Sequence, residues 1–213
     1  MKSGSSFIQT FDKLPTTLPV FPLARAVVLP GGELPLNIFE PRYLNMVQDA
    51  MSSHRLVGMI QPVDDQRVPK LYPIGCAGRI TRYAETADGR LEIVLSGVCR
   101  FRIVDEMRTT RGYRLVRPDW SPFAGDYHPI PVPGHAIEQF HCALKGYFER
   151  VGMNPDWKVL VALSAEQLAS NLVAALPLDV AEKQLLLEAA DLPERLALFT
   201  SLLSAGESSG LRH

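Results

Sequence analysis

The segment from residue 119 to 134 interrupts the chain with prolines, and the hydrophobic pattern differs on its two sides. Five prolines lie in or beside it: Pro118, Pro122, Pro129, Pro131 and Pro133. Because proline lacks a backbone donor and restricts its neighbours, we expect no regular element here and interpret the segment as a connection. Before it, apolar residues alternate with a period of two, as in strands; after it, they recur at helical spacing. The chain is therefore predicted to be a two-part α+β protein.

Strand signals open the first part. Residues 18–23 and 26–29 are short apolar runs, and residues 33–39 alternate apolar and other side chains after a Pro-Gly-Gly turn. Proline cannot donate a hydrogen bond to a β-ladder, so we expect edge strands or bulges wherever prolines fall within these strands. Three prolines do so: Pro19, Pro22 and Pro35.

A helix and a buried strand follow. Pro41 fits the first turn of a helix, where its missing N–H costs nothing, and apolar residues at helical spacing continue to about Ser53. Residues 56–60 are continuously apolar, so we expect a strand buried on both faces. Strand, strand, helix and strand thus follow one another within about forty residues.

A hairpin is predicted next. The turn at Thr86-Ala87-Asp88-Gly89 separates two period-two segments, and Asp-Gly supplies positive φ at little cost. Gly97 interrupts the second segment, which predicts a bulge or sharp bend. The pattern continues through residues 101–103 and 113–115 into another hairpin. Residues 18–118 are therefore expected to form a small mixed β-barrel or closed sheet with one inserted helix.

Residues 135–206 are predicted to form a bundle of about four helices. An apolar stripe from residue 137 to 151 ends at Gly152, which suits a helix C-terminus. We expect capping boxes at three further helix starts. In a capping box, the N-cap side chain and the side chain three positions later satisfy free backbone donors. The pairs are Ser164 with Gln167, Asp179 with Glu182, and Asp191 with Glu194.

Composition excludes several classes of protein. A net charge of −1 argues against a dedicated nucleic-acid binder. Three cysteines without a C-x-x-C pair suit a reducing compartment. Residues 1–17 are polar, lack the apolar core of a signal peptide and are expected to be partly disordered. No apolar run reaches the length of a membrane span, so we expect a cytoplasmic protein.

No catalytic site emerges from the residues. Cys142 lies next to His141, but neighbours on a helix point about 100° apart and cannot form a nucleophile–base pair with each other. The five histidines show no zinc-ligand spacing. The phosphate-binding motif G-x-x-x-x-G-K-[ST] is absent from the sequence, which argues against ATPase activity. We predict no catalytic residues, no metal and no cofactor.

Several motifs carry a family resemblance. They are Leu-Pro-Val-Phe-Pro-Leu at 18–23, Val-Leu-Pro-Gly at 28–31, Leu-Pro-Leu-Asn-Ile-Phe-Glu-Pro-Arg-Tyr at 34–43, Ile-Gly-Cys-Ala-Gly-Arg-Ile at 74–80, and Leu-Ser-Gly-Val-Cys-Arg-Phe-Arg-Ile at 95–103. Over nearly the whole chain, the sequence resembles the N-terminal substrate-recognition domain of ATP-dependent Lon protease. The resemblance implies a PUA-like β-barrel with an inserted helix and a C-terminal helical bundle. In Lon proteases an ATPase module and a peptidase module follow this domain, and this sequence stops where the first of them would begin. The resemblance therefore also implies a stand-alone recognition domain without proteolytic activity.

The resemblance further implies unfolded or partly folded polypeptide as the partner, with a separate protease as a further candidate. A groove between barrel and bundle is the expected site, since clefts between structural units commonly bind ligands. Its candidate lining residues are Pro35, Leu36, Phe39 and Tyr43. Glu40 and Arg42 are interpreted as structural, because a carboxylate is favoured at a helix N-terminus and Arg42 can pair with a carboxylate.

A PUA-like RNA- or nucleotide-binding module is the alternative. It would use arginines interleaved with aromatic residues in the second half of the strand region. These are Arg79, Arg82, Arg90, Arg100, Arg102, Arg108, Arg111, Arg114 and Arg117. Carboxylates such as Glu85, Glu92 and Asp105 lie among them, so paired, solvated strand faces are the preferred interpretation. A contiguous basic face free of carboxylates would favour the alternative.

Overall fold

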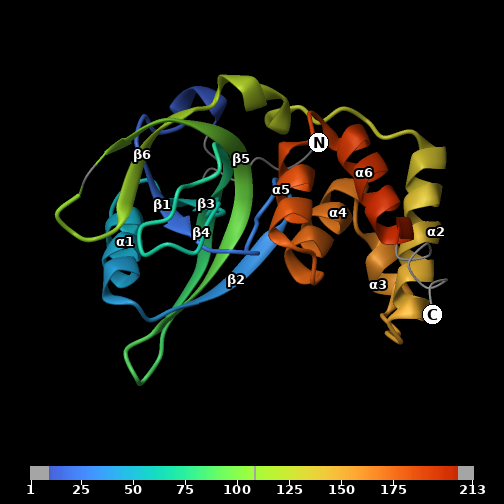
Figure 1. The fold of residues 1–213 in the computed structure, drawn as a ribbon, viewed down its shortest axis with the longest axis horizontal. Coiled ribbons are helices and arrows are strands. Elements are labelled where there is room, and N and C mark those ends of the chain that lie inside the picture. The colour runs from blue at the N-terminus through green and yellow to red at the C-terminus, as the bar shows by residue number, and fades with distance from the viewer. Residues whose placement is uncertain (1–9, 108, 206–213) are drawn as a thin grey trace.

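The structure, a computed structural model, describes residues 10–107 and 109–205, so most of the segment expected to be disordered lies outside it. Figure 1 shows a strand half on one side and a helical half on the other. After a 3₁₀ turn, η1 (Phe11–Lys13), come six strands: β1 (Leu18–Pro22), β2 (Glu33–Ile38), β3 (Leu56–Ile60), β4 (Ile74–Glu85), β5 (Leu91–Met107) and β6 (Arg114–Asp119). The strand half is these strands with α1 (Pro41–Met51); the helical half is α2 to α6. The α+β class is confirmed.

The six strands form a sheet in the order β2-β5-β4-β3-β1-β6, with an additional pairing between β5 and β6. The long strand β5 makes this possible, because residues 91–96 pair with β2 whereas residues 102–107 pair with β6. The pairing of β1 with β3 is parallel and the other pairings are antiparallel, so the sheet is mixed. β2 lies outside the circuit of pairings that joins the remaining strands.

Backbone geometry explains the proline in β2. Within the described residues this strand pairs only with β5. The N–H of Glu33 points away from β5 and donates to Oδ1 of Asn171 at 3.0 Å. Pro35, two residues further on, faces the same way, so its missing N–H removes no ladder hydrogen bond. Pro35 is therefore an edge proline, as predicted.

The prolines of β1 are accommodated differently. β1 lies between two strands, so the expectation of an edge strand is wrong for it. Its pairings are staggered: residues 18–20 pair with β6, whereas residues 20–22 pair with β3. Pro19 and Pro22 thus each have a paired partner on one side only.

The inserted helix α1 packs against the sheet as the sequence predicts. Pro41 occupies its first turn, and its buried face consists of Tyr43, Met46, Val47 and Ala50. The ring of Tyr43 lies 4.2 Å from that of Phe21 in β1. All five residues of β3 are buried, which confirms the prediction of a strand covered on both faces.

The predicted hairpin and bulge are both present. Gly89 in the β4–β5 turn has φ +81°. At the bulge, Ala77 pairs with Cys99 while Gly78 pairs with Gly97, so Val98 is the extra residue. A Cβ at Gly97 would lie 1.9 Å from the carbonyl oxygen of Leu29, which explains why glycine is needed there.

The helical half contains one helix more than predicted in the part that the structure describes. Its helices are α2 (Gly134–Arg150), α3 (Trp157–Ala162), α4 (Ala165–Ala175), α5 (Val180–Glu188) and α6 (Leu192–Ala205). None of the described helices is long and apolar enough to span a bilayer. The short helix α3 was missed, although Asp156 caps it by accepting from the N–H of Lys158.

Two of the three capping boxes form completely, at α4 and α5. At α6 only one of the two bonds of a capping box forms. The N–H of Glu194 donates to Oδ1 of Asp191 at 2.9 Å, but the Glu194 carboxylate accepts from the N–H of Ala190 instead of that of Asp191. The expectation of no regular element in 119–134 is wrong. A 3₁₀ segment, η2 (Ser121–Tyr127), forms there, with a kink at Phe123, whose side chain is buried.

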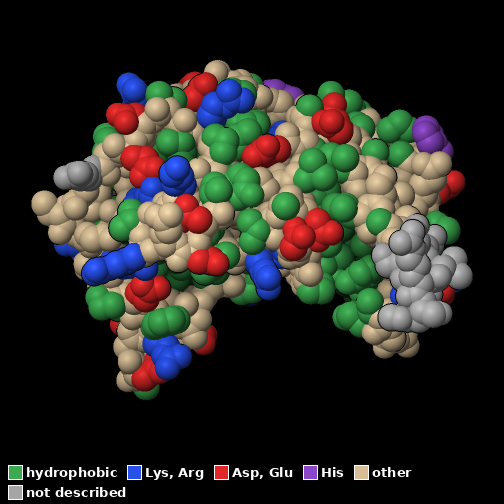
Figure 2. Space-filling view, viewed as in Figure 1, with side chains coloured by type: hydrophobic (Ala, Val, Ile, Leu, Met, Phe, Trp, Pro, Cys, Tyr) green, Lys and Arg blue, Asp and Glu red, His purple; other side chains and the backbone are tan. Residues whose placement is uncertain are grey.

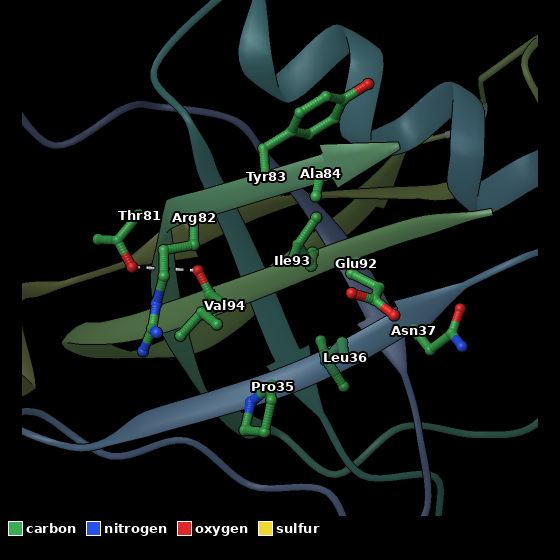
Figure 3. A pocket seen from close by; sticks show the side chains of 10 residues that line it. All are labelled: Pro35, Leu36, Asn37, Thr81, Arg82, Tyr83, Ala84, Glu92, Ile93 and Val94. Atoms are coloured by element: carbon green, nitrogen blue, oxygen red, sulfur yellow. Dashed lines mark hydrogen bonds between the residues drawn. The ribbon is translucent and has the colours of Figure 1, made fainter. Parts of the chain in front are cut away.

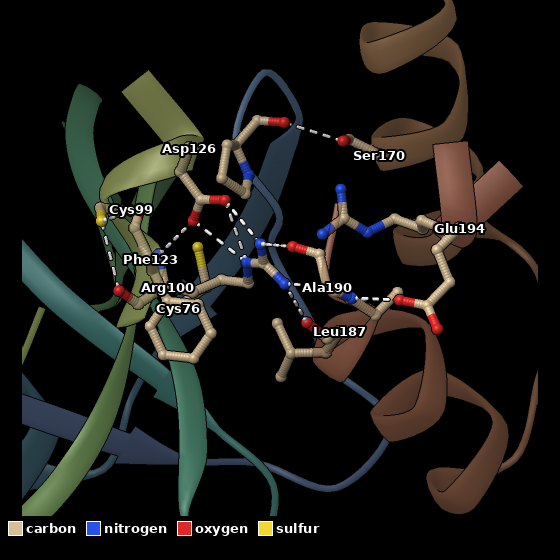
Figure 4. A network of polar contacts seen from close by, with 12 residues as sticks. Cys76, Cys99, Arg100, Phe123, Asp126, Ser170, Leu187, Ala190 and Glu194 are labelled. Atoms are coloured by element: carbon tan, nitrogen blue, oxygen red, sulfur yellow. Dashed lines mark hydrogen bonds and ion pairs between the residues drawn. The ribbon is translucent and has the colours of Figure 1, made fainter. Parts of the chain in front are cut away.

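A buried ion pair joins the two halves. Arg100 of β5 and Asp126 of η2 face each other at the junction of strands and helices, with Nη2 2.7 Å from Oδ1 (Figure 4). The same guanidinium donates to the carbonyls of Leu187, in the last turn of α5, and of Ala189 and Ala190, which follow that helix. One arginine therefore fastens β5, η2 and the α5–α6 connection together.

Candidate binding surface

A broad hollow lies on three strands at the open end of the sheet and has a volume of about 780 Å³. We call it the strand hollow (Figure 3). Its lining residues come from β2, β4 and β5: Pro35, Leu36, Asn37, Thr81, Arg82, Tyr83, Ala84, Glu92, Ile93 and Val94. It is open to solvent, and none of these residues belongs to the helical half.

Strand register separates the two faces of this region. Val94 lies between Pro35 and Arg82, whereas the next residue along β5, Ile93, is buried and lies between Leu36 and Tyr83. Successive side chains on a strand point to opposite faces, so the row through Val94 forms the outward face. Figure 3 shows Tyr83 directed to the other side, toward α1.

The outward face combines apolar side chains with a balanced set of charges. Pro35, Ala84 and Val94 supply its apolar part. The guanidinium of Arg82 pairs with Glu33 at 3.0 Å, and both side chains are more than half exposed. Such an exposed pair contributes little stability and can exchange partners readily. The surface can therefore make apolar contacts without selecting strongly for one sign of charge.

The structure brings together two of the four predicted contact residues. Pro35 and Leu36 line the strand hollow. Phe39 is 63% exposed just beyond the end of β2, and its ring lies 6.0 Å from the guanidinium carbon of Arg90. Tyr43 is only 6% exposed and lines a different hollow. Helix α1 carries Tyr43 into the core, which the apolar spacing of the helix could have indicated.

The predicted groove between strands and helices is not where these residues lie. A hollow of about 390 Å³ at that junction includes Glu166 of α4 with residues of β4 and β5, but none of the four candidates. Figure 2 shows a broad notch in the outline between the β4–β5 hairpin and the helical half. Sequence reasoning missed the three-strand hollow because it depends on long-range pairing of β2 with β5.

A second surface hollow of about 310 Å³ has three arginines among its lining residues, Arg42, Arg67 and Arg114. We call it the arginine hollow. Its other lining residues are Pro22, Tyr43, Pro62, Gln66, Val68, Pro69, Gly112 and Tyr113. It shares no lining residue with the strand hollow.

The arginines of the strand region do not form a single basic face. Five of them pair with carboxylates: Arg82 with Glu33, Arg90 with Asp88, Arg100 with Asp126, Arg111 with Asp49, and Arg114 with Glu106. Figure 2 shows basic and acidic side chains interspersed over the strand half. This pattern does not favour the nucleic-acid alternative, which needs a contiguous basic surface.

The two buried cysteines, Cys76 and Cys99, show no features of an activated nucleophile. Burial raises the pKa of the Cys76 thiol well above its ordinary value and that of Cys99 to about 12, and the charge of Asp126 adds to both shifts. Such thiols remain protonated and unreactive at neutral pH. Among the residues that the structure describes, no three His, Cys, Asp or Glu side chains are placed to hold a metal ion.

Comparison with known proteins gives one consistent result. Residues 17–205 match the family described as "ATP-dependent protease La (LON) substrate-binding domain". The chain is 25% identical over 203 residues to Lon protease 2 of Myxococcus xanthus, covering 91% of this chain and 24% of that protein. It therefore spans about a quarter of the length of this relative.

Solved structures agree. A crystal structure of a Lon N-terminal domain protein from Xanthomonas campestris superposes with a TM-score of 0.61 at 25% identity, covering 86% of this chain and 96% of that one. The N-terminal domain of a Mycobacterium avium complex Lon protease superposes with a TM-score of 0.66 at 19% identity, covering 88% of this chain and 98% of that one. The second likeness concerns the fold alone.

Proposed function

The chain belongs to the Lon substrate-binding domain family, and from this premise we propose that it binds polypeptides without cleaving them. Its clients are unfolded or partly folded chains. The strand hollow is the surface that contacts them. Of the predicted residues the proposal keeps Pro35, which lies on the outward face with Val94 and Arg82. Leu36 borders the hollow, but it lies in the row of Ile93 and packs partly against the core. Phe39, exposed beside the end of β2, extends the apolar contact. Tyr43 is assigned to the core instead.

The observation that carries this proposal is the hollow itself. Its volume of about 780 Å³ falls within the range of ligand pockets. Its apolar residues can bury client side chains, and each Å² of apolar surface removed from water contributes about 25 cal/mol. Unfolded chains share exposed apolar side chains and little else, so a mainly apolar surface of balanced charge suits such clients.

Contact through side chains is more important here than strand addition. The outer edge of β2 offers few free donors, because the N–H of Glu33 is already bonded to Asn171 and Pro35 has none. Prolines on edge strands commonly prevent uncontrolled strand pairing. A client chain can therefore lie across the outward face, whereas a continuous ladder along β2 is not available to it.

The absence of catalysis is part of the proposal. The two thiols with raised pKa are buried, and the sequence contains no phosphate-binding G-x-x-x-x-G-K-[ST] motif. We propose that unfolding and cleavage of bound clients fall to a separate protease. A cytoplasmic location fits the three free cysteines, Cys76, Cys99 and Cys142.

Titration with a fluorescent, permanently unfolded polypeptide tests the proposal. Val94→Glu places a charge in the strand hollow, and Val104→Glu places the same charge on an exposed part of the same strand outside it. We expect Val94→Glu to weaken binding by about fivefold or more and Val104→Glu to change it less than about twofold. Equal binding by wild type and Val94→Glu would show that clients bind elsewhere. Mass spectrometry of the client should show no new cleavage products.

A further inference from the structure

The arginine hollow brings three arginines together at a place that the proposed polypeptide site does not use. Arg42 lies at the start of α1, Arg67 in the loop between β3 and β4, and Arg114 at the start of β6. Three segments distant in sequence thus bring guanidinium groups to one hollow of about 310 Å³. No aspartate or glutamate is among the residues that line it.

Contacts between these segments hold the hollow in shape. Nη1 of Arg114 donates to the carbonyl oxygen of Pro69 at 2.7 Å, which ties the β3–β4 loop to β6. Gly112 has φ +85°, and a Cβ there would lie 3.3 Å from Cβ of Arg42. The backbone near β6 therefore lies close against the first turn of α1. The hydroxyl of Tyr113 donates to Asp49 of α1 at 2.9 Å and reinforces this contact.

Intramolecular partners engage the three arginines to different degrees. Arg42 bonds Glu40 through Nε and Nη2, so Nη1 is not engaged by that carboxylate. Arg114 uses Nε and Nη2 for Glu106 and Nη1 for the carbonyl oxygen of Pro69, so all three of its nitrogens are engaged. Arg67 has no hydrogen bond or ion pair within the described part of the chain, and its guanidinium offers five N–H donors.

We propose that the arginine hollow binds an oxyanion, the group shared by phosphates and carboxylates. Guanidinium groups bind both through paired hydrogen bonds. Arg67 offers its donors to such a group, and Arg42 offers Nη1 beside it. Glu40 and Glu106 flank the hollow and partly neutralise Arg42 and Arg114, which leaves Arg67 as the main unneutralised charge. The oxyanion belongs either to a free phosphate compound or to an acidic side chain of a bound polypeptide.

Isothermal titration calorimetry at low salt tests this site with two probes. Inorganic pyrophosphate represents a free phosphate, and a glutamate-rich peptide without phosphate represents an acidic polypeptide. The test variant is Arg67→Gln, which removes a side chain without intramolecular partners in the described part of the chain. The matched control is Arg90→Gln, which removes an equal charge from an exposed pair with Asp88 outside the hollow.

We expect Arg67→Gln to weaken binding of at least one probe by about tenfold, and Arg90→Gln to weaken it by less than about twofold. If Arg67→Gln weakens the binding of pyrophosphate, the oxyanion belongs to a free phosphate compound. If it weakens the binding of the peptide alone, the oxyanion is a carboxylate of a polypeptide. The proposal is overturned if neither probe binds wild type, or if both variants weaken binding equally. Because this site shares no residue with the strand hollow, its failure would leave the polypeptide proposal untouched.

Discussion

Arg100 and Asp126 form an ion pair with Nη2 and Oδ1 2.7 Å apart and with both side chains at most 6% exposed. Asp126 also accepts the backbone N–H of Arg100 at 2.9 Å. The face of the guanidinium lies 4.8 Å from the ring centroid of Phe123. The pair therefore fixes η2 on β5, and through three carbonyls it fixes the helical half on the strand half.

Removing Asp126 should destabilise the protein strongly. Asp126→Ala leaves the Arg100 charge buried without its carboxylate, and loss of one partner of a buried pair typically costs about 3–5 kcal/mol. The measurement is the free energy of unfolding in urea. Asp88→Ala, which breaks the exposed pair with Arg90, is the control and should cost less than about 1 kcal/mol. Equal losses in the two variants would mean that the buried pair does not hold the junction.

A methyl group at Gly97 should also be poorly tolerated. The added Cβ would lie 1.9 Å from the carbonyl oxygen of Leu29, so the backbone at one of these two residues must move. We expect Gly97→Ala to lower the free energy of unfolding by about 4 kcal/mol or more. Few point mutations cost this much, and those that do have a specific structural cause, here the clash of the new Cβ with the backbone. Gly89→Ala is the comparison: its φ of +81° is unfavourable for alanine, but nothing lies within 4 Å, and about 1 kcal/mol is expected. Similar losses would argue against the close approach.

Stability should fall in alkaline solution through Cys99. Burial, with a contribution from Asp126, raises the pKa of its thiol from 9.0 to about 12. Between these two pKa values the folded thiol keeps its proton while the unfolded thiol releases it. The contribution of Cys99 to the free energy of unfolding is therefore fully present below pH 9 and is lost as the pH approaches 12. The free energy of unfolding should decrease through this window by up to about 1.4 kcal/mol per pH unit for this group.

Cys99→Ala should make that decrease shallower, although it also lowers stability at neutral pH by removing a buried side chain. Cys142→Ala, which removes an exposed thiol, should keep the slope of the wild type. Urea unfolding at several pH values from about 8 to about 11 measures the slopes. If the decrease of the free energy of unfolding with pH were unchanged in Cys99→Ala, the Cys99 thiol would not be its cause.

Local sequence patterns were sufficient to predict much of the fold. The alternation in β2, the apolar run of β3, the Asp-Gly turn and the boxes at α4 and α5 each depend on residues close in sequence. Short elements anchored by one residue were harder to predict. Phe123 stabilises η2 among prolines by its burial, and α3 depends on a single cap at Asp156.

The site could be predicted only in part, because its shape depends on long-range pairing. Pro35 and Val94 are 59 positions apart and meet only through the register of β2 with β5. The contacts of Arg100 with Asp126 and with the carbonyl of Ala190 also cross between elements, which no local pattern reveals. The motif that contains Tyr43 identifies a family but does not show which of its side chains are exposed, and Tyr43 is buried.

Photo-crosslinking can show directly whether clients bind at the strand hollow. A photoreactive benzoylphenylalanine replaces Arg82, an exposed residue of the hollow, or Val159, a 58% exposed apolar residue of α3. Each protein is irradiated with the same client, once unfolded and once native. We expect crosslinks from position 82 to the unfolded client only, and few crosslinks from position 159. Crosslinking mainly from position 159, or equal crosslinking of native and unfolded client, would contradict this expectation.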